Sequence, residues 1–341
     1  MGFFDFFTSE IAIDLGTANT LIICNDKIVV EEPSIVALDR TNGKVLAVGK
    51  KAMQMHEKTH PNIKTVRPLK DGVIADFTVA EHMIREMIKM IHPGRRFFTP
   101  SLRMVICIPS GITEVEKRAV KDSAEHAGAK EVYMIHEPMA AAIGIGIDVE
   151  EPNGNMIVDI GGGTTEIAVI ALAGIVCNES IRTAGDHLNN DVLDYMRRQH
   201  NLLIGERSAE KIKIEVGSSL SELENPPEDI EIMGRDLMTG IPKVVSVGYS
   251  EIAQAIDKTI SKIEDAVLKA LELTPPELSG DILKNGIHLT GGGALLRGLD
   301  KRISAKAKVK VYVADDPLRA VVRGTGIVLK NIETFRGILM T

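Results

Sequence analysis

A short glycine-containing segment occurs twice in this chain. The first copy, residues 13–20, reads IDLGTANT, and the second copy, residues 158–165, reads VDIGGGTT. In each copy an apolar run leads to an aspartate, Asp14 or Asp159, and a glycine-containing turn and a second apolar run follow at once. This pattern predicts a strand, a tight turn and a second strand, which together form a β-hairpin. The repetition predicts a chain built from two related halves.

Both turns have the composition of a phosphate-binding loop. Glycine lets backbone N–H groups approach phosphate oxygens without a Cβ in the way. An aspartate at the end of a buried strand can hold a hydrated Mg²⁺ ion. We therefore expect an ATPase that binds one ATP between the hairpins, with Mg²⁺ held by Asp14 and Asp159. The expected phosphate contacts are Gly16, Thr17, Ala18 and Asn19 in one hairpin and Gly161, Gly162 and Gly163 in the other.

Other phosphate-binding motifs are absent from the sequence. The chain has no G-x-x-x-x-G-K-[ST] segment, and no G-x-G-x-x-G segment opens a predicted helix. Neither Walker nor Rossmann chemistry is therefore expected. One copy of the hairpin alone would be compatible with an ordinary turn, and the repetition favours the functional interpretation.

A third glycine cluster lies near the C-terminus. Residues 286–296 read GIHLTGGGALL, which predicts a strand, a triple-glycine turn and the start of a helix. Such a turn allows close approach of a flat group or a phosphate, and a helix N-terminus favours negative charge. The alternative is a plain strand-to-helix turn. We expect nucleotide contacts from Thr290, Gly291, Gly292 and Gly293.

Together with residues 135–142 (IHEPMAAA), these segments resemble the actin/Hsp70/sugar-kinase superfamily. Within it, DLGTANT and DIGGGTTE are similar to the MreB family of bacterial actin homologues, which determine rod shape. The similarity extends from about residue 11 to about residue 329. It implies an α/β fold, the duplicated actin-like (ribonuclease H-like) ATPase fold, with two large domains that each carry a small subdomain. It also implies homopolymer filaments and membrane-bound cell-wall synthesis proteins as partners.

The domain boundaries follow from composition. Acidic residues, proline and glycine cluster at 148–155, where we expect the second domain to begin. The predicted core of domain I comprises residues 1–32, 66–147 and 315–341, with 33–65 as its small subdomain. The predicted core of domain II comprises 148–180 and 245–314, with 181–244 as its small subdomain.

Helix starts are marked by capping residues. Thr78 with Glu81 predicts a capping box for a helix that ends at Pro93-Gly94, and Thr113 with Glu116 predicts a second box for a helix ending near Gly128. Strands are predicted at 102–108 and 131–135.

Catalytic roles are assigned to Glu137 and Thr164. Glu137 follows a predicted strand and opens a helix, where it would orient the attacking water, which Thr164 would also hold. ATP hydrolysis depends mainly on positioning and charge neutralisation, so one carboxylate and one hydroxyl suffice. The alternative for Glu137 is a helix-cap carboxylate. The resemblance implies that Glu210 and Lys213, three residues apart on a predicted helix, contact ribose and adenine; the alternative is a solvated ion pair.

Charge and cysteine content indicate which partners and which cellular compartment to expect. A net charge of −7 argues against nucleic acid as the main partner. Cys24, Cys107 and Cys177 stand singly in apolar runs and are predicted to be reduced core thiols. No basic region precedes the N-terminal phenylalanines, so a secretory signal is not expected. The expected location is the cytoplasm.

Two aromatic clusters are compatible with a membrane surface, and the resemblance to the MreB family implies that they attach the chain peripherally to inner-leaflet lipids. Phe3, Phe4, Phe6 and Phe7 fall within an arc of about 160° on a helix. Phe97 and Phe98 follow two arginines, a combination suited to an anionic membrane surface. The alternative for each cluster is packing against its own domain.

Two other functions belong to the same superfamily. A small-molecule kinase would need a substrate cleft with a catalytic aspartate, and residues 32–65 offer little chain to build one. An Hsp70-like chaperone would need a C-terminal peptide-binding domain, and too few residues follow the third glycine cluster.

Overall fold

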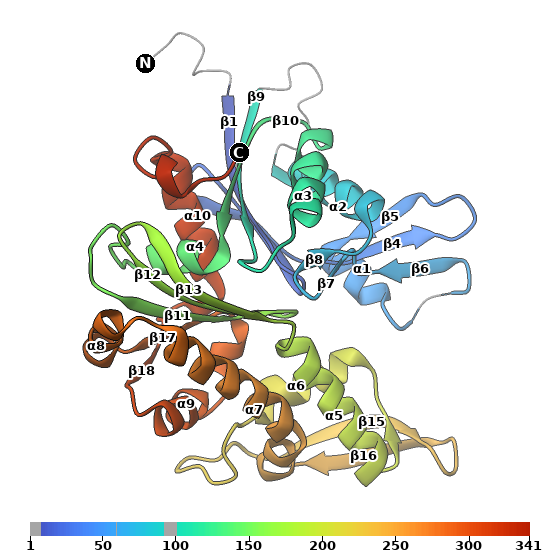
Figure 1. The fold of residues 1–341 in the computed structure, drawn as a ribbon. Helices are drawn as coiled ribbons and strands as arrows, with labels where there is room; N and C mark the ends of the chain where they lie inside the picture. The colour runs from blue at the N-terminus through green and yellow to red at the C-terminus, as the bar shows by residue number, and fades with distance from the viewer. Residues whose placement is uncertain (1–7, 59, 92–100) are drawn as a thin grey trace. The chain divides into compact units, whose positions relative to one another are not determined.

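The computed structural model describes residues 8–58, 60–91 and 101–341. The chain divides into two compact units (Figure 1). Unit 1 comprises Met1–Pro152, Ile170–Val176 and Leu318–Thr341, and unit 2 comprises Asn153–Val169 and Cys177–Pro317. Within the described ranges, none of the helices has both the length and the apolar character needed to cross a membrane.

Unit 1 is built on a five-stranded mixed sheet with the order β10-β9-β1-β2-β3. The predicted first hairpin is present, because β1 and β2 pair antiparallel with Asp14 opposite Leu21. β3 continues the antiparallel meander, whereas β9 is parallel to both β1 and β10. The strands are β1 (Thr8–Leu15), β2 (Asn19–Cys24), β3 (Lys27–Pro33), β9 (Ser101–Ile108) and β10 (Ala129–His136).

Helices cover both faces of this sheet because its strands are apolar on both sides. Alternate residues such as Ile11 and Ile13 pack with α2 (Phe77–Ile91) and α3 (Glu114–His126). Residues of opposite parity face α10 (Ala320–Lys330): Cys107 contacts Thr325, and Ile23 lies against Gly326. α4 (Glu137–Gly144) packs beside α10 on that second face (Figure 1).

Smaller sheets complete unit 1. β4 (Val36–Asp39) lies between β5 (Val45–Val48) and β6 (Ile63–Val66), and α1 (Gly49–Met55) packs on these strands. β7 (Leu69–Lys70) pairs with β8 (Val73–Ile74).

Unit 2 repeats the strand order of unit 1. Its sheet runs β13-β12-β11-β17-β18, which is the order β3-β2-β1-β9-β10 when corresponding strands are matched. β17 is parallel to β11 and β18, as β9 is parallel to β1 and β10. The duplicated α/β architecture predicted from the sequence is therefore confirmed. The strands are β11 (Asn155–Ile160), β12 (Thr165–Ala171), β13 (Gly174–Ile181), β17 (Ile287–Thr290) and β18 (Val311–Val313). The end of β12 and the start of β13 lie within Ile170–Val176, the segment that is grouped with unit 1.

The helices of unit 2 enclose one apolar core with this sheet. They are α5 (Gly185–Gln199), α6 (Glu206–Val216), α7 (Tyr249–Leu273), α8 (Pro276–Asn285) and α9 (Leu299–Ala307). A small three-stranded sheet of β14 (Leu202–Leu203), β15 (Ile230–Asp236) and β16 (Pro242–Val247) extends from α5 and α6. All three cysteines are buried thiols outside any disulfide, as predicted.

Two local predictions need correction. The cap of α2 is Asp76, whose carboxylate accepts from the backbone N–H of Val79 at 3.1 Å. Thr78 lies inside the helix, and Glu81 instead binds Arg85 at 2.6 Å. The third glycine cluster opens a short 3-10 helix, Gly292–Leu295, and the α-helix begins only at Leu299. The capping box of Thr113 and Glu116 and the two predicted strands are confirmed.

Candidate functional site: two glycine hairpins

The first glycine turn is held in place by Ser34. The Ser34 hydroxyl donates to the Gly16 carbonyl at 2.6 Å and lies 2.9 Å from the Thr20 hydroxyl. The Ser34 backbone N–H donates to the Ala18 carbonyl at 2.9 Å. These bonds use carbonyl oxygens of the turn. The turn is therefore fixed by bonds on its carbonyl side, as a preorganised anion-binding loop requires.

Thr17 and Gly16 have distinct structural roles in this turn. Thr17 is buried, and its hydroxyl accepts from the backbone N–H of Gly72 at 2.9 Å. A Cβ on Gly16 would lie 2.6 Å from the Asn19 carbonyl oxygen, so the turn has room only for glycine. Asn19 is exposed at the start of β2.

Glu137 and Asp14 lie at the same edge of the unit 1 sheet. Asp14 is near the carboxyl end of β1, and Glu137 directly follows the carboxyl end of β10. Because β1, β9 and β10 are mutually parallel, these ends meet at one edge, where ligands bind in open α/β sheets. Glu137 is also the first residue of α4, with Pro138 in the same turn. A carboxylate there is stabilised by the helix dipole.

The second glycine turn is bonded to the N-terminus of α5. The Gly161 N–H donates to the Thr164 carbonyl at 2.9 Å and closes the turn. The carbonyls of Gly161 and Gly162 accept from the N–H groups of Gly185 at 3.1 Å and Asp186 at 2.8 Å. The hairpin and the helix start therefore form one rigid backbone assembly, with Thr164 buried inside it.

Asp159 is a buried carboxyl group at the end of β11. Thr290, at the end of the neighbouring β17, donates its hydroxyl proton to Asp159 at 2.7 Å. Burial raises the pKa of Asp159 to about 6, against the lowering effect of Thr290 and with a further raising effect from the charge of Glu166. A nearby cation would favour the ionised form of such a group. The Asp159 carboxylate is therefore compatible with the predicted role in holding Mg²⁺.

The Gly291–Gly293 turn packs against the end of β11. A Cβ on Gly291 would meet the Ile160 carbonyl oxygen, and a Cβ on Gly293 would meet the Ile160 side chain. Gly291 also has a φ of 78°, which favours glycine. The turn is therefore held directly beside the strand that ends in the second hairpin.

Lys213 points from α6 toward the same assembly. Its ammonium donates to the Gly185 carbonyl at 3.3 Å, at the first residue of α5. Glu210 lies on the same helix, and both side chains are half-buried. Unit 2 thus brings Asp159, the second glycine turn, Thr290 and Lys213 to one end of its sheet.

The first glycine turn belongs to unit 1 and the second belongs to unit 2. No group of three or more His, Cys, Asp or Glu side chains is arranged as a metal site in the part of the chain that the structure describes. The predicted membrane residues Phe3, Phe4, Phe6, Phe7, Phe97 and Phe98 lie outside the described residues. Sequence reasoning missed Ser34, Gly72 and Gly185, whose contacts come from distant segments.

A family model described as MreB/Mbl protein matches residues 8–337 of the chain. The chain belongs to the MreB/Mbl family. Among curated MreB/Mbl relatives, cell shape-determining protein Mbl of Bacillus subtilis (strain 168) is 48% identical over 328 residues, covering 96% of this chain and 97% of the relative. Cell shape-determining protein MreB of Escherichia coli (strain K12) is 47% identical over 340 residues, covering 98% and 97%.

Solved structures of the MreB/Mbl family confirm the fold. The crystal structure of MreB 5 of Spiroplasma citri bound to AMPPNP aligns with a TM-score of 0.90 and 38% identity, covering 97% of this chain and 98% of that one. The ADP-bound form of the same protein aligns with a TM-score of 0.89. A MamK double helical filament, 23% identical, aligns with a TM-score of 0.78, covering 96% and 99%, and supports the fold alone.

Proposed function

We propose that this chain is an ATP-dependent, filament-forming, actin-like cytoskeletal protein that determines cell shape. The observation that carries the proposal is the pair of glycine hairpins at equivalent positions of two sheets with the same strand order. Each hairpin is braced through its carbonyl groups and has an aspartate, Asp14 or Asp159, at the end of its first strand. The MreB 5 relative was solved with AMPPNP, an ATP analogue, and with ADP.

In the proposed reaction, ATP is hydrolysed to ADP and phosphate. The N–H groups at Gly16–Asn19 and at Gly162 and Gly163 bind the phosphate oxygens, because backbone N–H groups of glycine turns can converge on an anion. Gly161, whose N–H closes the second turn by donating to Thr164, lines the phosphate site through its backbone. Glu137 orients the attacking water and Thr164 holds it, so that hydrolysis depends on positioning. Glu210 and Lys213 contact the ribose and adenine, and the Thr290–Gly293 turn lies along the nucleotide.

Asp14 and Asp159 are the residues proposed to hold Mg²⁺, through water molecules. When bound, Mg²⁺ neutralises negative charge on the phosphates. Asp159 fits this role because a nearby positive charge would stabilise the ionised form of its buried carboxyl group. Asp14 occupies the corresponding strand end in unit 1.

The proposed cellular role adds three further features. Copies of this chain polymerise into filaments, the filaments lie at the inner face of the cell membrane, and they organise membrane-bound cell-wall synthesis proteins. The family membership and the names of the relatives, cell shape-determining proteins, support this role. The aromatic clusters near the N-terminus and at residues 97–98 are the proposed lipid contacts.

Sedimentation of the purified chain tests the proposal. Polymer is expected in the pellet with Mg·ATP and not without nucleotide, and electron microscopy of that pellet should show filaments. Asp14→Asn is expected to weaken Mg·ATP binding by about 10-fold or more, a typical loss when a residue around a bound metal is changed. A chain that hydrolyses no ATP and never sediments, or that phosphorylates a sugar instead, would reject the proposal.

A further inference from the structure

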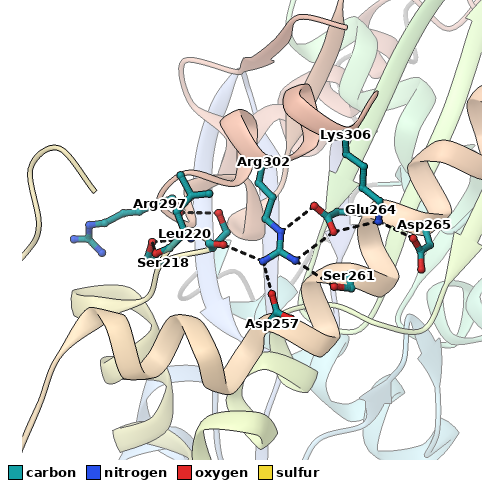
Figure 2. Close-up of polar contacts among 10 residues, drawn as sticks. Ser218, Leu220, Asp257, Ser261, Glu264, Asp265, Arg297, Arg302 and Lys306 are labelled. Atoms are coloured by element: carbon teal, nitrogen blue, oxygen red, sulfur yellow. Dashed lines mark hydrogen bonds and ion pairs between the residues drawn. The ribbon is translucent and has the colours of Figure 1, made fainter. Parts of the chain in front are cut away.

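Arg302 in α9 uses every N–H group of its guanidinium. Its Nε donates to Glu264 at 2.9 Å. One terminal nitrogen donates to the Ser219 carbonyl at 3.0 Å and to Asp257 at 2.8 Å. The other donates to Ser261 at 3.2 Å and to the second oxygen of Glu264 at 3.3 Å. Figure 2 shows the bonds from Arg302 to Asp257, Ser261 and Glu264 converging on its planar guanidinium group.

The side-chain partners of Arg302 form a polar stripe on α7. Asp257, Ser261 and Glu264 are spaced by four and three residues, so they share one face of the helix. The Glu264 side chain is only 6% exposed, so its charge requires a bonded partner. Burial opposes a charged Arg302, yet the bonds to Glu264 and Asp257 outweigh it and raise the pKa of the guanidinium.

Ser219 connects this network to the nucleotide-binding helix α6. Residues 217–220, here called the 217–220 loop, directly follow α6. The backbone N–H and the hydroxyl of Ser219 donate to the Arg297 carbonyl at 2.8 and 3.0 Å. The carbonyl of Ser219 accepts from Arg302. Ser219 is thus bonded on one side to Arg297 and on the other to Arg302.

Arg297 in turn caps α6. Its guanidinium donates to the carbonyls of Ile214 at 3.1 Å and Gly217 at 3.3 Å, in the last turn and at the C-cap of the helix. A cation at that end also complements the helix dipole. Arg297 lies four residues after Gly293, so the same short segment carries the glycine turn and the cap of α6. The positions of α6 and of the glycine turn are therefore linked through the 217–220 loop.

We propose that Arg302 is a positioning residue for the nucleoside end of the bound nucleotide. It fixes the 217–220 loop, and through it the separation between α6, which carries Glu210 and Lys213, and the Gly291–Gly293 turn. The inference rests on the proposed function, because it assumes that these two elements bind the nucleoside of ATP. Lysine would replace this arginine only in part, because its three donors lack the planar fork that bonds α7 and the Ser219 carbonyl together.

The experiment compares the wild-type protein and four variants by Mg·ATP affinity and by melting temperature. The first variant, Arg302→Met, removes all five bonds. The second, the double variant Arg302→Met with Glu264→Met, also removes the buried carboxylate that has lost its Arg302 partner, so much of the lost stability should return. In both variants the Ser219 carbonyl loses its partner. The control is Lys306→Met: Lys306 binds Glu264 at 3.4 Å and Asp265 at 2.8 Å, but an Arg302 bond still holds the 217–220 loop.

Mg·ATP affinity is expected to fall about 10-fold in both Arg302 variants, the equivalent of one lost buried hydrogen bond, and to change little in the control. Arg302→Lys should give an intermediate loss and also serves if Arg302→Met does not fold. Wild-type affinity in Arg302→Met, or affinity that recovers with melting temperature in the double variant, would show that Arg302 only stabilises the fold. A wild-type protein that binds no nucleotide would instead reject the proposed function and this inference with it.

Discussion

Gly144 of α4 and Gly324 of α10 lie where the two helices cross, and there the two backbones are in direct contact. A Cβ on Gly144 would lie 2.9 Å from the Gly324 nitrogen, and a Cβ on Gly324 would lie 2.9 Å from the Gly144 nitrogen. Each Cβ would also meet a carbonyl oxygen of the other helix, that of Ala320 or Ala140. Because α4 begins with Glu137, this crossing sets where the proposed catalytic carboxylate lies.

Gly324→Ala is expected to force the two helices apart. The added methyl group has no space, and overpacking of this kind typically costs about 1–3 kcal/mol of stability. The shift of α4 should also slow ATP hydrolysis, because small displacements of a positioned group reduce the rate strongly. Thermal unfolding and steady-state phosphate release measure the two effects.

Gly280→Ala is the matched control for this substitution. Gly280 also lies within a helix, α8, but a Cβ there would meet nothing within 4 Å. Alanine should therefore stabilise that helix by up to about 1 kcal/mol. Equal melting temperatures for the two variants would contradict the packing argument at the crossing.

Glu137→Ala is expected to slow ATP hydrolysis by about 100-fold or more, a typical loss for a positioned acid–base group. Nucleotide affinity should be retained, because the proposed phosphate contacts come from the two glycine turns. Single-turnover hydrolysis and equilibrium binding of Mg·ATP separate the two quantities. Unchanged turnover would remove Glu137 from the mechanism and leave it as a helix-cap residue.

The raised pKa of Asp159 leads us to expect that the stability of the nucleotide-free, Mg²⁺-free protein depends on pH. The folded-state pKa of about 6 lies above the ordinary value of 3.8, so folding favours the protonated form. The contribution of protonated Asp159 to the free energy of unfolding is fully present below pH 3.8 and is lost as the pH rises through about 6. The loss amounts to about 3 kcal/mol at most.

Asp159→Asn should therefore raise the melting temperature at pH 7–8 and have little effect near pH 4. Thermal unfolding of wild type and variant across this pH range measures the difference. A gain that is the same at both ends of the range would show that the carboxyl group is not the cause.

Removal of the aromatic clusters is expected to release filaments from membranes. Burial of one Phe side chain contributes about 1.5–3 kcal/mol at most, so a monomer should bind weakly. A filament presents the cluster from every subunit, and the attachments combine by avidity. Deletion of residues 2–7 with Phe97→Ser and Phe98→Ser should abolish flotation of filaments with anionic vesicles and leave ATPase activity intact. Equal flotation of variant and wild type would favour packing of these phenylalanines within their own domain.

The duplicated fold was predictable because its signal is local and repeated. Each hairpin carries its apolar runs, its aspartate and its glycine turn within one short segment, as residues 13–20 show. The prediction for the cap of α2 was wrong because Asp76 and Thr78 are both favourable N-cap residues. The sequence alone does not determine at which of the two the helix begins. The α-helix expected after Gly293 starts later because Gly298, with a φ of 76°, precedes Leu299.

The bracing of the site was not predictable, because its contacts join distant segments. Ser34 bonds to Gly16 across a sequence separation of 18 residues, and Arg302 bonds to Ser219 across a separation of 83. A polar stripe such as Asp257, Ser261 and Glu264 indicates a partner, since it interrupts the buried face of an otherwise apolar helix. It does not reveal which arginine of the chain is that partner. The residue assignments for nucleotide and Mg²⁺ remain predictions that the variants above test.

Unit 1 is assembled from both ends of the chain, which has a consequence for biosynthesis. α10 covers one face of the sheet at Ile23 and Cys107, and Met340 exchanges backbone hydrogen bonds with Met134 at 2.8 and 2.9 Å. On the ribosome, the strands that contain Ile23 and Cys107 are made long before α10. The growing chain must therefore carry an uncovered apolar sheet face while the whole of unit 2 is translated. Chaperone binding to nascent chains should accordingly persist until residues 320–330 have left the exit tunnel.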